Sequence, residues 1–110
     1  MRLSEADRNA FSDVLVALVP QGRLYLYGSR TDDSLKGGDI DLLLVVADLD
    51  AKRELSGRKS VILVAFKKRV GERKIDFSIA TESELLSDPF FASVIGGALI
   101  LAEWKSGTRA

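Results

Sequence analysis

Apolar and polar residues alternate along the chain with two different periods. Near the N-terminus the spacing of apolar residues is three or four, which predicts one helix. Its apolar stripe consists of Ala10, Phe11, Val14, Leu15 and Leu18. Ser4 has the side chain of an N-cap residue, and Pro20-Gln21-Gly22 is expected to end the helix.

Four segments have the pattern of strands. Arg23–Tyr27 is short and aromatic, and Asp39–Ala47 is a nearly continuous apolar run that is typical of a central strand. In Lys74–Ala80 the apolar residues alternate with polar ones, so Ile75 and its apolar neighbours should face the core while Asp76 faces away. The last expected strand is Ala98–Ala102.

Helical segments separate the later strands. Ala51–Val70 is expected to be helical, with Gly71 after its end and a bend at Ser56-Gly57 left open. Within it, the apolar run Val61–Phe66 has the length of a strand, but we favour a helix. Thr81 can cap a short helix through Glu84, and a further helix should run from Asp88-Pro89 to Gly96-Gly97. This order predicts an α/β fold, a small mixed β-sheet with helices packed on it. We expect a single domain over residues 1–105 and a C-terminal tail over residues 106–110.

Composition removes several kinds of chemistry. The 110 residues include 16 basic and 16 acidic side chains, so no net charge attracts the chain to nucleic acid. There is no Cys and no His, which excludes a thiol nucleophile, an imidazole base and a zinc site built from these residues. Any metal should be a hard cation on oxygen ligands, Mg²⁺ or Mn²⁺. No apolar run has the ~20 residues of a membrane span, so we expect a cytoplasmic protein.

Two aspartates open the expected central strand. Residues two apart in a strand share a face, so Asp39 and Asp41 should point together while Ile40 enters the core. Adjacent carboxylates repel each other, and a protein tolerates this where a cation neutralises them. If the strand of Asp76 is a neighbour, Asp76 completes a cluster of three carboxylates that suits metal-dependent phosphoryl or nucleotidyl transfer.

A candidate phosphate-binding segment precedes these aspartates. Gly28 lets the backbone come close to a ligand, and Ser29 offers a hydroxyl and a backbone amide. Arg30 can hold a phosphate with its fork of donors, although it could equally be a surface residue.

These motifs resemble the minimal nucleotidyltransferases of the DNA polymerase β-like nucleotidyltransferase superfamily. The resemblance is carried by Gly28-Ser29, by Asp39-Ile40-Asp41 at the start of the next strand, and by Asp76 on a later strand. It implies a nucleotidyltransferase-like fold, in which all three aspartates are catalytic and ligate Mg²⁺, and in which Gly28 and Ser29 bind the nucleotide phosphates. The gap before Asp39 is one residue shorter than usual, and Gly38 replaces a common Ser.

The resemblance also implies a partner and a reaction. Minimal nucleotidyltransferases often pair with a helical HEPN-type toxin, to which they act as antitoxins by transferring AMP from ATP to a tyrosine. We therefore expect an enzyme that uses ATP or another NTP, modifies a hydroxyl on such a partner and forms no contact with a membrane. The apolar C-terminal region with Phe90 and Phe91 favours a partner or, failing that, a homo-oligomer.

Two other functions stay open from the sequence. The chain could be a binding module with weak or absent catalysis, or a nucleotidyltransferase for a small hydroxyl compound such as an aminoglycoside. A nucleic-acid patch at Lys67-Lys68-Arg69 is less favoured, because such residues commonly complement a helix C-terminus and no aromatic platform accompanies them.

Overall fold

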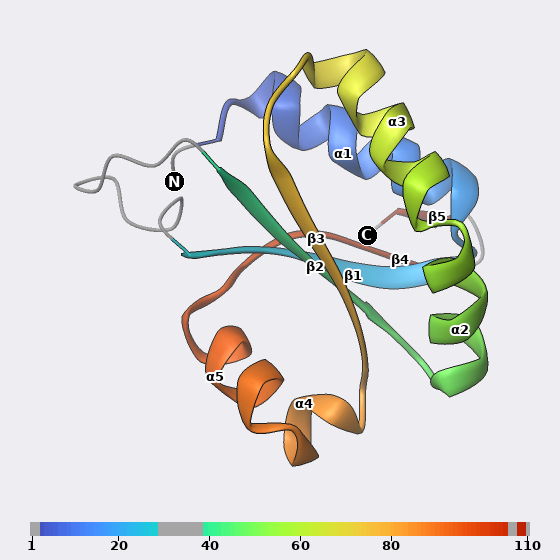
Figure 1. Cartoon of the computed structure of the whole chain (residues 1–110), viewed down its shortest axis with the longest axis vertical. Helices are drawn as coiled ribbons and strands as arrows, with labels where there is room; N and C mark the ends of the chain where they lie inside the picture. Colours follow the sequence, from blue (N-terminus) through green and yellow to red (C-terminus); the bar gives the residue numbers. More distant parts are fainter. Residues whose placement is uncertain (1–2, 29–38, 106–107, 110) are drawn as a thin grey trace.

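The computed structural model describes residues 3–28, 39–105 and 108–109 (Figure 1). These residues form five helices and five strands. The helices are α1 (Glu5–Leu18), α2 (Leu49–Gly57), α3 (Lys59–Val70), α4 (Glu84–Ser87) and α5 (Pro89–Gly97). The strands are β1 (Gln21–Tyr27), β2 (Ile40–Val46), β3 (Ile75–Thr81), β4 (Leu99–Lys105) and β5 (Thr108–Arg109). Along the chain the order of these elements is α1-β1-β2-α2-α3-β3-α4-α5-β4-β5.

The strands form one sheet in the order β3-β2-β1-β4-β5. β2 and β3 run parallel, whereas β1 is antiparallel to both β2 and β4, and β4 is antiparallel to β5. The sheet is therefore mixed, and helices pack on it (Figure 1). This confirms the predicted α/β class.

One face of the sheet is covered by α1, α2 and α3 and holds the main core (Figure 1). At its centre the rings of Phe11, Phe66 and Phe77 stack edge to face, with centroid distances of 5.0 Å and 5.5 Å. All three side chains are buried. Aromatic pairs in this geometry stabilise a core beyond the effect of their buried area.

The opposite face carries α4 and α5 and a smaller core (Figure 1). Its fully buried residues are Leu43, Val45 and Ala80, and Tyr25, Tyr27 and Phe91 pack against them. Neither α4 nor α5 contains a buried residue. This second face is thus covered much less completely than the first.

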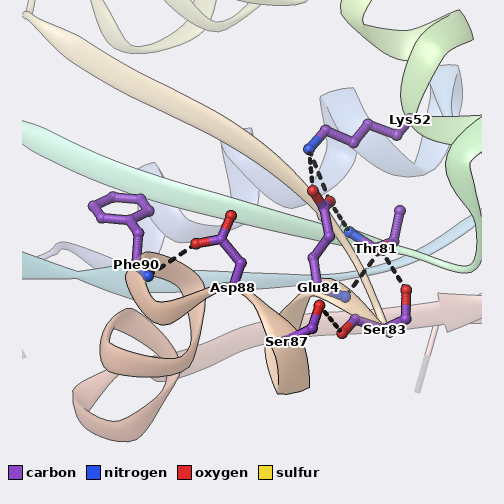
Figure 2. Close-up of polar contacts among 7 residues, drawn as sticks. All are labelled: Lys52, Thr81, Ser83, Glu84, Ser87, Asp88 and Phe90. Atoms are coloured by element: carbon purple, nitrogen blue, oxygen red, sulfur yellow. Dashed lines mark hydrogen bonds and ion pairs between the residues drawn. The ribbon is translucent and has the colours of Figure 1, made fainter.

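A capping box begins α4, as the sequence predicts. The Glu84 N–H donates to Thr81 Oγ1 at 3.1 Å, and the Thr81 N–H donates to Glu84 Oε1 at 2.9 Å (Figure 2). The ammonium of Lys52 on α2 also donates to both oxygens of Glu84, at 2.8 and 2.9 Å. These contacts join the two helix layers around the end of the edge strand β3.

The predicted helical segment over residues 51–70 is confirmed, but it belongs to two helices with a break next to Ser56-Gly57, where the sequence leaves a bend open. α2 begins earlier, at Leu49, and Arg58 separates it from α3. Val61–Phe66 is helical as favoured, and Gly71 ends α3 with a φ of 90°. Among the described residues, no helix has both the length and the apolar content needed to cross a membrane.

The C-terminal residues differ from the expected tail. Thr108 and Arg109 form β5 and pair with Lys105 and Trp104 at the end of β4. β4 itself extends to Lys105, three residues beyond the predicted strand.

Candidate active site

Asp41 and Asp76 lie directly opposite each other on the parallel strands β2 and β3. The neighbouring Ile40 and Ile75 are buried in the main core, so alternation directs both aspartates to the second face of the sheet. The two carboxyl groups interact, and Asp76 raises the pKa of Asp41. The structure therefore brings together two of the three aspartates that the sequence singles out.

The surroundings of Asp41 raise its pKa, so they disfavour its ionised form. Partial burial raises the pKa of Asp41, and the hydrogen-bonding contact with Asp76 raises it further. The charges of Asp76 and Asp39 act in the same direction, and the Lys74 ammonium opposes them. A raised pKa means that ionising Asp41 costs the folded state stability, which a bound cation would restore.

Asp39 lies just before β2, and its carboxylate turns to Lys74. Asp39 Oδ2 is 3.5 Å from the Lys74 Nζ; the Lys74 side chain is largely exposed and the Asp39 side chain about half exposed. Within residues 3–28, 39–105 and 108–109, no three acidic side chains already form a group that could hold a metal ion. The aspartates thus form a close pair, Asp41 and Asp76, with Asp39 beside it in an ion pair.

Gly28 packs its backbone against the carboxylate of Asp41. It follows the last residue of β1 and has a φ of 77°, a conformation that favours glycine. A Cβ atom at this position would lie 2.3 Å from Asp41 Oδ2, so the carboxylate would have to move to make room for it. The sequence predicts a close backbone approach at Gly28, and the structure shows the carboxylate as its neighbour.

The other two predicted site residues, Ser29 and Arg30, lie outside the described residues. Two residues that the sequence analysis did not assign to the site are next to it. Tyr27 is opposite Asp41 on the neighbouring strand, and Lys74 contacts Asp39. The alternation that places Lys74 on the face of Asp76 was the available signal for Lys74.

A cavity of about 460 Å³ lies at the other end of the sheet. It is lined by the ends of β2 and β4 together with Arg23 and Glu82, and neither Asp41 nor Asp76 contributes to it. An enclosed pocket is the usual site for a small ligand. The aspartates are instead at a different position on the sheet, where substrate binding would need further groups.

Comparison of the chain with models of known protein families and with curated protein sequences gives no match. The chemistry of the site therefore rests on the residues themselves. They supply carboxylate oxygens, one ammonium and a close backbone approach, a set that suits a hard divalent cation and a phosphate.

Proposed function

We propose that this protein is a nucleotidyltransferase that transfers a nucleoside monophosphate, AMP from ATP, to a hydroxyl group. The observation that supports this most is the in-register pair of Asp41 and Asp76, with the backbone of Gly28 against the Asp41 carboxylate. Repelling carboxylates of this kind are expected where a protein binds a divalent cation for phosphoryl chemistry.

The donor set fits Mg²⁺, with Mn²⁺ as a substitute. Asp41 and Asp76 would hold it through carboxylate oxygens, the ligands that such hard cations prefer. Asp39 would join them on leaving its ion pair with Lys74. The Lys74 ammonium already acts as a positive charge on this cluster. When bound, the metal would supply Lewis-acid stabilisation of the negative charge that develops on the phosphates.

The chain's own residues account for the remaining roles. The acceptor hydroxyl oxygen forms a bond to the α-phosphorus of ATP, and the bond from that phosphorus to the β-phosphate bridging oxygen breaks. The hydroxyl proton passes to the carboxylate of Asp76, and pyrophosphate leaves. Amides at Gly28 and Ser29 and the guanidinium of Arg30 would bind the phosphates.

A helical HEPN-type protein in the cytoplasm is the acceptor we propose, through one of its tyrosines. Apolar residues exposed on α4 and α5 support a protein partner, because Leu86 is 89% and Phe90 56% exposed. Leu99 and Ile100 at the start of β4 are also exposed. Large apolar side chains that stay exposed can mark an interface.

A second candidate is a binding module that neutralises its partner by covering it. The pairing of Asp39 with Lys74 favours this reading, because the third carboxylate is engaged by a protein cation. Self-association and transfer to a small hydroxyl compound are further outcomes that the same experiment distinguishes.

The test uses ATP labelled on the α-phosphate, Mg²⁺ and the protein co-expressed with the product of the neighbouring gene. We expect label on the partner protein, and a loss of at least about a hundredfold in rate for Asp41→Asn. Asp50→Asn is the matched control, because Asp50 is exposed on α2. Partner binding without label supports the binding module. Transfer by Asp41→Asn at the wild-type rate would refute the assignment.

A further inference from the structure

Lys74 is held beside the aspartate cluster by the backbone of the sheet. Its carbonyl oxygen accepts a hydrogen bond of 3.0 Å from the Ile40 N–H, which fixes the start of β3 next to the start of β2. Lys74 directly precedes β3 and stands two residues before Asp76, so the alternation of the extended chain places both side chains on the same side. The fold therefore places the Lys74 ammonium group next to the carboxylates of the aspartate cluster.

The Lys74 ammonium group forms an ion pair with Asp39, but its exposed side chain has room to move. Its Nζ lies 3.5 Å from Asp39 Oδ2, and its side chain is 71% exposed. Lys74 is also the cation that offsets the repulsion acting on Asp41. An exposed ion pair of this kind is weak, so a stronger cation can break it.

We propose that Lys74 is a built-in counter-ion that occupies Asp39 in the metal-free protein and moves to the nucleotide when the metal binds. This inference rests on the proposed function. A divalent cation at the cluster competes with Lys74 for Asp39, because two positive charges on one carboxylate repel each other. The released ammonium then lies beside a site that receives a triphosphate, and it binds a phosphate oxygen. Lys74 is thus a nucleotide-binding residue whose removal has opposite effects on the affinities for the metal and for the nucleotide.

The test is a titration of the full chain with Mn²⁺ alone, followed by electron paramagnetic resonance. We expect Lys74→Met to bind Mn²⁺ about two- to fivefold more tightly than the wild type, because the competing cation is gone. The same variant should bind ATP in the presence of Mg²⁺ about two- to fivefold more weakly. Lys74→Arg retains the charge and should bind Mn²⁺ as the wild type does.

Lys59→Met is the matched control. Lys59 is exposed at the first position of α3, whereas Lys74 follows the C-terminal end of that helix, and both variants lose one positive charge. Its affinities for Mn²⁺ and ATP should not change. If Asp41→Asn abolishes Mn²⁺ binding but Lys74→Met leaves the affinity unchanged or weaker, the role of Lys74 alone is wrong. If the wild type binds no Mn²⁺, both this inference and the proposed function are wrong.

Discussion

The two faces of the sheet differ in how they are covered. On the face of α1, α2 and α3, side chains such as Phe11, Leu15 and Phe66 are completely buried. On the face of α4 and α5, no helical residue is buried, and the aspartates lie at one end. We infer that the first face contributes most of the buried apolar contacts that stabilise the fold. The second face can therefore carry aspartates whose mutual repulsion lowers the stability.

The composition of the helices makes the same point. α3 buries Ile62 and Phe66 in the main core and carries three of its four charged residues in its last turn. α5 has no charged residue, yet its Phe90 side chain is exposed. An apolar helix that remains half exposed fits a surface that another molecule covers.

Removing an aromatic ring from each face tests this difference most strongly. Phe66→Ala should lower the free energy of unfolding by about 3–5 kcal/mol, because it leaves a cavity between two other rings. Phe90→Ala should change it by less than about 1 kcal/mol, because that ring is largely exposed. Urea denaturation measures both values, and similar losses in the two variants would contradict the division of roles.

Gly28 and Gly71 both have a positive φ, so comparing alanine variants of the two distinguishes the effect of backbone strain from the effect on the site. Gly28→Ala and Gly71→Ala should each cost about 1–3 kcal/mol of stability, because both place a side chain in a strained conformation. Only Gly28→Ala also forces a Cβ against the Asp41 carboxylate, since nothing lies within 4 Å of a Cβ at Gly71. We expect Gly28→Ala to lose Mn²⁺ binding and Gly71→Ala to retain it. Equal Mn²⁺ affinities would show that the contact with Asp41 is unimportant.

The ion pair between Lys52 on α2 and Glu84 on α4 should contribute a smaller, pH-dependent amount to the free energy of unfolding. The hydrogen bond from Lys52 lowers the pKa of Glu84 below its ordinary 4.5, and the bond from the Thr81 N–H acts in the same direction. The stability that Glu84 adds is therefore present above pH 4.5 and is lost as the pH falls through the lowered pKa.

Glu84→Gln keeps an oxygen for the capping box but removes the ion pair with Lys52. It should cost about 0.5 kcal/mol at neutral pH, and the difference from the wild type should vanish well below pH 4.5. Urea midpoints at the two pH values measure this. A difference that persists in acid would assign the loss to the capping box instead.

The features that the sequence could predict are local ones. Alternation in β3 shows that Phe77 enters the core and that Asp76 does not, and the structure agrees. The caps at Ser4 and Thr81 follow from side chains that accept hydrogen bonds from nearby amides. Such signals depend on a few neighbouring residues, so the sequence contains them in full.

The features that the sequence could not predict depend on tertiary contacts. The sequence leaves open a bend at Ser56-Gly57, and the break falls at Arg58, whose guanidinium donates a hydrogen bond to the distant Leu18 carbonyl. The pairing of Asp41 with Asp76 requires that β2 and β3 be parallel neighbours, which the sequence analysis could only assume. The contact between Lys74 and Asp39 follows from that same pairing.

The most direct test of the proposed site is the free energy of unfolding with Mg²⁺ and ATP, compared with its value in a chelator. At a hundredfold excess over Kd, the ligands should stabilise the wild type by about 2.7 kcal/mol. Asp41→Asn should show no such gain, yet in chelator it should be at least as stable as the wild type, because it removes a carboxylate with a raised pKa. No gain in the wild type, or an equal gain in Asp41→Asn, would contradict a metal-dependent nucleotide site at these aspartates.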